Sequence, residues 1–136
     1  MASMSFEVNA VGPLKLSQQF MAHVAASDQK KIVIITSKAG SFEESPEMPM
    51  MYSYRGSKAA LNMFAYTLSF ETPKRGITLA LLSPGQVNTV DLKGMKRPGM
   101  IEPVESVSKM LKVIDNLTPD DNGKFLDYED GRVIPW

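Results

Sequence analysis

The sequence predicts an α/β fold in which parallel strands alternate with helices. Two short apolar runs, at residues 32–35 and 77–82, have the composition of strands buried on both faces. Segments with helical periodicity separate the strands, which indicates right-handed helical crossovers and therefore a parallel sheet. With 136 residues, the chain is expected to form one domain, and a small one for this class.

The first helix is expected over residues 6–26, because apolar side chains repeat there on one face. Gly12 and Pro13 interrupt this pattern. Since Pro13 has no N–H, the carbonyl of Asn9 loses its usual helical donor and needs another partner. Two interpretations remain open: Pro13 only kinks the helix, or it leaves the Asn9 carbonyl available to bind another group. The candidate buried positions are Phe6, Val11, Leu14, Phe20, Met21 and Val24.

The central helix is expected from Tyr54 to about residue 70, where Pro73 and Gly76 follow to end it. A loop at residues 42–51 precedes it, since two prolines and three glutamates fall there. A further helix is expected to begin at Pro103, and a short last strand is expected over residues 123–128. The order is therefore helix, strand, helix, strand, helix, strand.

Composition excludes several classes of function. The formal net charge is zero, so nothing attracts the chain to nucleic acid or to an anionic membrane. There is no cysteine, which excludes disulfides and thiolate ligands and suits a cytoplasmic protein. The sole histidine, His23, has no neighbouring ligands, so no metal site is expected. No apolar run reaches the roughly 20 residues that a membrane span needs.

Tyr54 and Lys58 are the first candidates for chemistry. In a helix they are i and i+4, so both side chains emerge on one face, one turn apart. An unperturbed phenol titrates near ~10, and a neighbouring cation favours the phenolate. The pair could therefore act as an acid–base unit. The alternative is a helix-capping aromatic residue beside a solvated lysine.

Further polar groups are expected near this pair. Ser37 follows the first strand and Pro84-Gly85 follows the second, at the carboxyl edge where open α/β sheets bind ligands. These groups suit hydride transfer to a carbonyl: Ser37 would hold the carbonyl oxygen and Tyr54 would exchange the proton. Lys58 would keep the phenol acidic, and Asn9 would hold a relay water. The hydride must come from a cofactor. There are alternatives to these roles. Ser37 and Pro84-Gly85 could simply form turns, and Asn9 could lie on the helix surface.

Four motifs in this order resemble the short-chain dehydrogenase/reductase family. They are Asn9, Ile35-Thr36-Ser37-Lys38-Ala39-Gly40, Tyr54-x-x-x-Lys58 and Pro84-Gly85-x-Val87-x-Thr89. Residues 51–62 and the closing segment 130–136 are similar to the C-factor-like and sniffer-like carbonyl reductases within that family. The resemblance runs from about residue 6 to the C-terminus.

The resemblance implies a site and a cofactor. By it, Asn9, Ser37, Tyr54 and Lys58 are a catalytic tetrad, and Lys58 lowers the pKa of the tyrosine. Tyr54 and Lys58 would also contact the nicotinamide ribose. The cofactor would be NAD or NADP, with NADP favoured, and the substrate a small carbonyl compound or alcohol. The residues implied at the nicotinamide ring and carboxamide are Pro84, Gly85, Val87 and Thr89.

The chain also departs from the family pattern. Nothing in it resembles the Gly-rich turn that binds the pyrophosphate, and the family's four N-terminal strands are missing. Residues 1–136 therefore resemble the carboxyl half of a Rossmann-like three-layer sandwich, a single incomplete domain. Such a chain is expected to bind dinucleotide poorly and to leave an open sheet edge at residues 32–35. The alternative function is a non-catalytic module that forms a homo-oligomer, or pairs with a full-length homologue, through its first and central helices.

Overall fold

The computed structural model describes residues 2–89 and 98–136. In these residues helices and strands alternate along the chain, as the sequence predicted. The sheet is parallel, in the order β1-β2-β3, and Lys31 of the first strand pairs with Thr78 of the second. The α/β class is therefore confirmed. The strands are β1 (Lys31–Ile35), β2 (Thr78–Ser83) and β3 (Phe125–Asp127).

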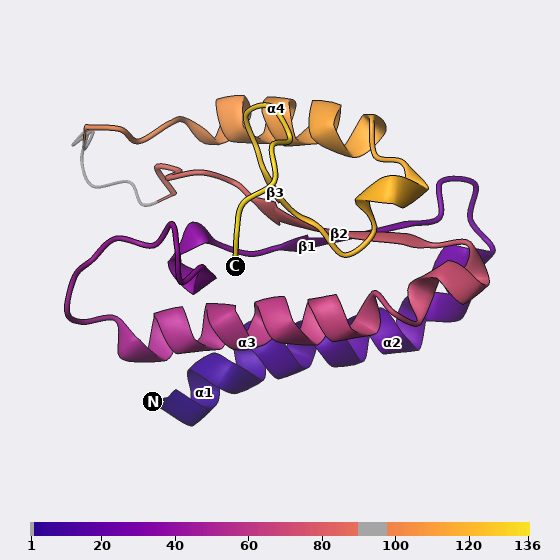
Figure 1. The fold of residues 1–136 in the computed structure, drawn as a ribbon, viewed down its shortest axis with the longest axis horizontal. Coiled ribbons are helices and arrows are strands. Elements are labelled where there is room, and N and C mark those ends of the chain that lie inside the picture. The colour runs from indigo at the N-terminus through magenta and orange to yellow at the C-terminus, as the bar shows by residue number, and fades with distance from the viewer. Residues whose placement is uncertain (1, 90–97) are drawn as a thin grey trace.

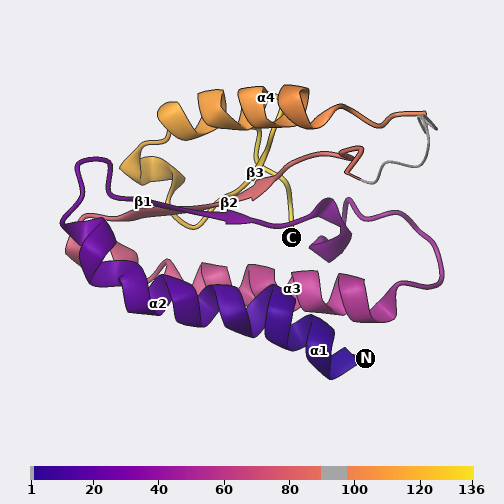
Figure 2. The same ribbon diagram turned by 180° about the vertical axis from the view of Figure 1, so that it is seen from behind.

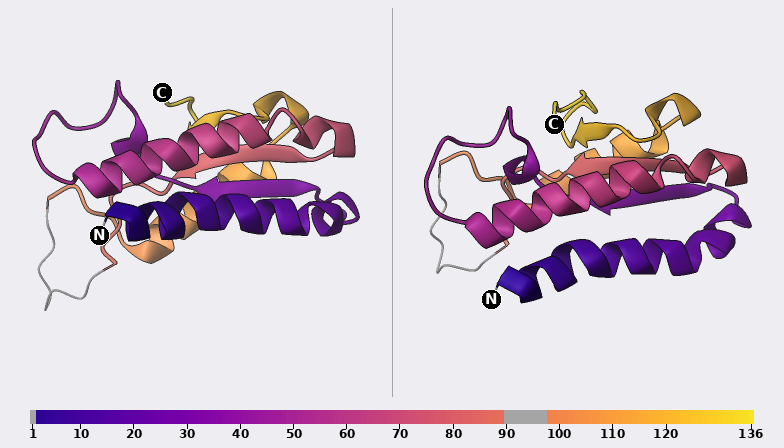
Figure 3. Two further views of the ribbon diagram at one scale, coloured as in Figure 1. Left: turned by 90° about the horizontal axis from the view of Figure 1, so that it is seen from below. Right: turned by 60° about the horizontal axis from the view of Figure 1, so that its bottom comes forward.

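Helices cover both faces of the sheet and so make three layers. The helices are α1 (Ala2–Phe6), α2 (Gly12–Ala25), α3 (Tyr52–Leu68) and α4 (Pro103–Asp115), with 3-10 turns η2 (Lys38–Gly40), η3 (Thr72–Arg75) and η4 (Pro119–Asp121). Helices α2 and α3 lie on one face and α4 lies on the other (Figure 1). Seen from below, α2 and α3 run side by side beneath the sheet (Figure 3).

The first helix contains a π-helical turn just before Gly12 and Pro13, where a kink was one of the two interpretations of the sequence. The turn η1 (Glu7–Val11) joins α1 to α2, and Figure 2 shows the three as one continuous rod. The N–H of Gly12 donates to the carbonyl of Glu7, five residues back, instead of the usual four. This turn of the helix therefore contains one residue more than an α-helical turn, and it forms a π-bulge just before Pro13. Asn9 lies inside this bulge, a feature that is common at functional sites.

Burial of the first helix differs from the sequence-based expectation. Met21 is buried, and Leu14 and Val24 pack against the core. Phe6 and Phe20 were wrongly expected to be buried: both are exposed, and Phe20 keeps 52% of its surface accessible. Periodicity selects the apolar face of a helix, but a neighbouring element must cover that face before its residues are buried. The part of the chain that the structure describes leaves this portion uncovered.

The core forms on both faces of β2. All six residues of this strand are buried, as expected for a central strand. Leu79 and Leu81 face α2 and α3, whereas Ala80 and Leu82 face α4, because successive side chains of a strand alternate between faces. The sheet therefore carries two small apolar cores, and its carboxyl edge is held in place from both sides.

Strand β1 is less buried than its apolar run predicted. Ile32 and Ile34 are buried toward α2 and α3, but Ile35 keeps 47% of its surface accessible. The reason is topological. Among the described residues β1 pairs only with β2, so it lies at the edge of the sheet. This is the open edge that the sequence predicted. No helix in the described residues is long and apolar enough to cross a membrane.

Candidate active site

Ser37 lies in the turn that leaves β1. The N–H of Thr36 still bonds to the carbonyl of Leu82 at 2.9 Å, so the chain is fixed to the sheet up to the residue before the serine. Ser37 itself is extended and caps η2: its Oγ accepts the N–H of Ala39 at 3.1 Å, and its carbonyl accepts the N–H of Gly40 at 3.0 Å. The hydroxyl is thereby held at the carboxyl edge of the sheet.

The turn after Ser37 packs directly on helix α3. A Cβ built on Gly40 would lie 2.8 Å from the backbone carbon of Lys58 and 2.9 Å from its oxygen, so only glycine allows this approach. Beside it, the hydroxyl of Thr36 donates to Oδ1 of Asn62, and both side chains are buried. These two contacts tie the strand end that carries Ser37 to the helix that carries Lys58.

Tyr54 and Lys58 occupy the first turns of α3, as predicted. The Nζ of Lys58 lies 5.9 Å from the centroid of the Tyr54 ring, a cation–π distance. Partial burial lowers the pKa of the Lys58 ammonium, because removal of water disfavours its charged form. Tyr54 keeps 38% of its surface accessible.

Asn9 joins this group through a short hydrogen-bond chain. Its Nδ2 donates to Oγ of Ser57 at 3.0 Å, and that hydroxyl donates to the backbone carbonyl of Tyr54 at 2.8 Å. Ser57 is fully buried, with 0% of its surface accessible, so the chain is shielded from competing water. The π-bulge of the first helix is therefore attached to the turn of α3 that carries the tyrosine.

The segment after β2 also has a defined shape. Gly85 has φ of +81°, a conformation that favours glycine, and a Cβ there would lie 2.6 Å from a ring carbon of Tyr128, which would have to shift. The carbonyl of Pro84 accepts the hydroxyl of Ser106 at 2.6 Å, which fixes the segment to α4.

Beyond Gly85, the segment turns back on itself. Val87 forms a parallel bridge with Ile101, and the N–H of Asn88 donates to the carbonyl of Ile101 at 2.9 Å. The N–H of Thr89 donates to the carbonyl of Val87 at 2.9 Å. The four residues expected at the nicotinamide thus lie on one ordered stretch that leaves the carboxyl end of the central strand.

The structure therefore joins the Ser37 turn to α3 at the Lys58 backbone, and joins Asn9, through Ser57, to the backbone carbonyl of Tyr54. Residues 84–89 leave the neighbouring strand at the same edge of the sheet. Sequence reasoning missed Asn62 and Ser57, which connect these segments. A signal was available: Asn62 interrupts a buried apolar stripe of α3, and a polar residue in such a place needs a partner.

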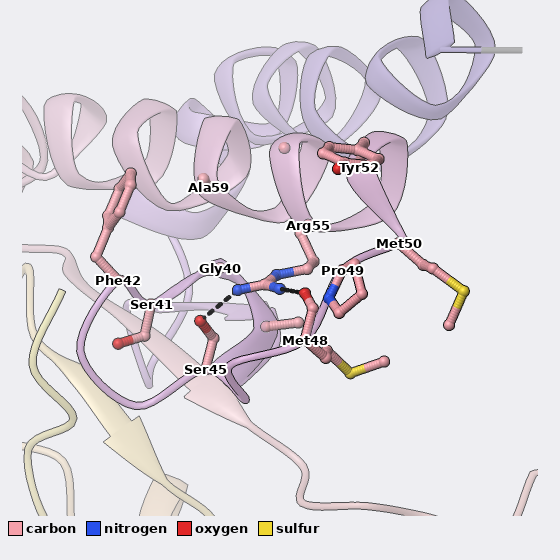
Figure 4. A pocket seen from close by; sticks show the side chains of 12 residues that line it. Gly40, Ser41, Phe42, Ser45, Met48, Pro49, Met50, Tyr52, Arg55 and Ala59 are labelled. Carbon is pink, nitrogen blue, oxygen red and sulfur yellow. Dashed lines mark hydrogen bonds between the residues drawn. The ribbon is translucent and has the colours of Figure 1, made fainter.

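A pocket of about 330 Å³ opens beside this site, on another face of α3. Arg55 lies in its wall, where its guanidinium bonds to Oγ of Ser45 at 2.7 Å and to the carbonyl of Met48 at 3.0 Å (Figure 4). Most of its wall is apolar. The lining residues that Figure 4 labels are Gly40, Ser41, Phe42, Ser45, Met48, Pro49, Met50, Tyr52, Arg55 and Ala59.

The family model for short chain dehydrogenases matches residues 2–99. The chain belongs to the short-chain dehydrogenase family. Among curated proteins, the chain is 36% identical over 133 residues to the C-signal protein of Myxococcus xanthus, covering 97% of the chain and 76% of that protein. It is 35% identical over 133 residues to the 1-hydroxy-2-glutathionyl-2-methyl-3-butene dehydrogenase of Rhodococcus sp. strain AD45, covering 96% of the chain and 56% of that enzyme.

Comparison with solved structures also places the chain among proteins of this family. The NADPH-bound carbonyl reductase from chicken fatty liver is 36% identical and superposes with a TM-score of 0.88, over 99% of this chain and 57% of the other. The Drosophila melanogaster carbonyl reductase Sniffer is 27% identical with a TM-score of 0.81, over 96% and 55%. The predicted similarity to C-factor-like and sniffer-like proteins and the Rossmann-type fold are confirmed. The chain spans little more than half the length of these reductases.

Proposed function

We propose that this chain supplies the proton-transfer groups of an NAD(P)-dependent oxidoreductase that interconverts a carbonyl compound and an alcohol. Residues 1–136 would form the carboxyl-terminal part of a single Rossmann-like domain. Family membership supports the reaction class. The observation that supports the proposal is the packing of Gly40 on the Lys58 backbone, because it brings the turn after Ser37 against the helix that also carries Tyr54.

The residues present suit the nicotinamide end of a dinucleotide. Tyr54 and Lys58 would hold the ribose, and Pro84, Gly85, Val87 and Thr89 would line the nicotinamide, as the ordered backbone at the end of β2 allows. When bound, this cofactor supplies the hydride. The binding of NADPH by the similar chicken reductase favours NADP over NAD.

Each side chain then has a task. Tyr54 passes the proton between its phenol oxygen and the carbonyl oxygen of the substrate, and Lys58 places a positive charge beside that phenol. Ser37 orients the carbonyl: its Oγ already accepts the N–H of Ala39, so its own O–H remains to donate to the substrate oxygen. Asn9 is anchored through Ser57, and its carbonyl, inside the π-bulge, would hold the relay water.

The direct test is cofactor binding and turnover by the purified chain. Titration with NADPH and with NADH, followed by cofactor fluorescence, is expected to show binding that is weak, because the chain has no Gly-rich turn for the pyrophosphate, but saturable and tighter for NADPH. Consumption of NADPH with a simple aromatic aldehyde should follow. Absence of both saturable binding and turnover would contradict the proposal for this chain.

Pairing through the first and central helices is the second candidate function. It is favoured by exposed apolar side chains along α1, η1 and α2, at Met4, Val8, Leu16 and Phe20. Large exposed apolar patches often mark protein interfaces. The occupant would be a second copy of the chain or a longer homologue.

Sedimentation velocity tests this pairing. The chain is expected to sediment as a dimer, and Leu16→Glu/Phe20→Glu is expected to weaken the dimer at least about 10-fold, because it removes two apolar anchors. Lys15→Gln, which changes a neighbouring exposed position, should have no such effect. A monomer at all concentrations, without and with the homologue present, would exclude pairing.

A further inference from the structure

The segment from Lys38 to Met51 joins Ser37 to the helix that begins before Tyr54. Only its first three residues form a regular turn, η2, and the rest is a loop. Met50 and Met51 have φ of +86° and +61°, which is unfavourable for residues with a side chain. Such a conformation persists only where surrounding contacts impose it. Together with the contacts of Gly40 and Thr36 on α3, the contacts that hold this loop therefore help to determine where the serine and the tyrosine lie relative to each other.

The first contact comes from the C-terminal segment. Arg132 donates two hydrogen bonds to Glu44, from Nη1 to Oε1 at 2.7 Å and from Nη2 to Oε2 at 2.9 Å. This bidentate geometry is the strongest and most directional form of an ion pair. The carbonyl of Arg132 accepts the N–H of Asp127 at 2.9 Å, so the backbone that carries this guanidinium is fixed to β3.

The same C-terminal segment makes two further bonds to the loop. Ser41 Oγ donates to the carbonyl of Pro135 at 2.6 Å, and the N–H of Glu43 donates to the carbonyl of Trp136 at 3.3 Å. The ring of Trp136 stacks on Phe125 of β3, with 5.7 Å between centroids. The loop is therefore attached to the last residues of the chain.

The second contact comes from α3. Arg55, the residue after Tyr54, bonds to Ser45 and to the Met48 carbonyl at the pocket described above (Figure 4). Ser45 is adjacent to Glu44 in the chain. Two guanidinium groups from different elements thus hold neighbouring residues of one loop.

Further charges surround Glu44. Lys38 Nζ lies 4.0 Å from Glu44 Oε2 and 3.2 Å from Oδ1 of Asp127, a side chain with only 6% of its surface accessible. Asp130 accepts the N–H of Arg132. The hydrogen bond from Arg132 lowers the pKa of Glu44, with smaller contributions from the charges of Arg132 and Lys38. Lys38 follows Ser37 directly, so this network ends beside the site.

We infer that Arg55 and Arg132 are positioning residues of the proposed site. Together they hold Glu44 and Ser45 in place, and so set the separation between Ser37 and Tyr54 without touching the reacting atoms. The effect of these two arginines on catalysis rests on the proposed function. Their effect on the order of the loop can be measured in the purified chain even if it has no turnover.

Amide exchange provides the structural measurement. The N–H groups of Ala39 and Gly40 bond to Ser37, so their exchange reports on the order of that turn. Arg132→Gln and Arg55→Gln are each expected to accelerate it about 3- to 5-fold, while the buried amides of β2 keep their rates. Arg132→Lys should give a smaller acceleration, because it keeps the charge but loses the bidentate geometry. Glu44→Gln should add nothing to Arg132→Gln if the two residues act as a pair.

The single tryptophan gives an independent readout. Trp136 is the only tryptophan of the chain, so acrylamide quenching of its emission is expected to rise in Arg132→Gln and in Glu44→Gln. Because the folded pKa of Glu44 is lowered, its bond to Arg132 is present above the ordinary glutamate range, near 4.5, and is lost as the pH falls through the lowered value. Quenching should therefore stay level down to the ordinary glutamate pKa, near 4.5, and rise only below it, and Glu44→Gln should remove that rise.

Glu105→Gln is the matched control, since it breaks an exposed ion pair of 3.1 Å with Lys109 on α4. It should leave the Ala39 and Gly40 amides unchanged. In an active preparation, Arg132→Gln and Arg55→Gln should lower kcat and leave the KM for cofactor unchanged. Unchanged exchange at Ala39 and Gly40 in both arginine variants, or an equal acceleration in Glu105→Gln, would overturn the inference. Absence of turnover in the unmodified chain, with exchange responding as expected, would count against the proposed function alone.

Discussion

Tyr54→Phe is expected to lower the turnover of a carbonyl substrate by about 10²- to 10⁴-fold, the usual contribution of a positioned general acid. Phenylalanine keeps the ring beneath the Lys58 ammonium and removes only the O–H. Because the ring is exposed, the free energy of unfolding should change by less than about 0.5 kcal/mol. The measurement is kcat for NADPH-dependent aldehyde reduction, together with a urea unfolding curve for each protein.

Two companion variants make this prediction specific. Tyr52→Phe removes a hydroxyl two residues earlier in the same helix and should leave kcat unchanged. Lys58→Met should lower kcat without lowering the melting temperature, because partial burial already disfavours the ammonium. A Tyr54→Phe protein that retains full turnover would show that the proton comes from another group.

Gly40→Ala is expected to reduce the free energy of unfolding by about 1–3 kcal/mol, the usual cost of inserting atoms into a packed contact. The new methyl group would meet the Lys58 backbone at 2.8–2.9 Å, and a helix backbone cannot move aside as a flexible side chain can. The turn must then lift from α3 and carry Ser37 with it. Turnover should therefore fall together with stability.

Gly56→Ala is the matched control for this effect. Gly56 lies inside α3, and a Cβ there would meet only the ring of Phe6, at an ordinary contact distance of 3.6 Å. Alanine in a helix is more favourable than glycine, so this variant should be more stable by about 0.5–1 kcal/mol. Urea unfolding of both variants tests the pair. Equal stability of Gly40→Ala and the unmodified chain would mean that the turn does not rest on the helix backbone.

The order and type of the elements could be predicted from the sequence because local periodicity determines them. The apolar run at residues 77–82 and the stripe of α3 gave a strand and a helix where the structure has β2 and α3. Burial was less predictable. The apolar run in β1 is typical of a strand covered on both faces, yet coverage depends on elements elsewhere in the chain, and Ile35 remains exposed.

The candidate site was predictable in its motif residues and not in the contacts that connect them. Pro13 signalled a lost hydrogen-bond donor near Asn9, but the choice of a π-bulge over a kink came from the surrounding structure. The bond from Thr36 to Asn62 spans 26 residues, and the one from Arg132 to Glu44 spans 88. No local pattern encodes such pairs, because their partners are set only when the whole sheet assembles.

The outer edge of β1 has a practical consequence. In the part of the chain that the structure describes, no strand lies beyond it, so its outward N–H and C=O groups can hydrogen-bond to another molecule. Natural proteins protect such edges because exposed strands template aggregation. Concentrated solutions of this chain should therefore precipitate over time, and Ile35→Lys should slow the rise in turbidity measured by light scattering.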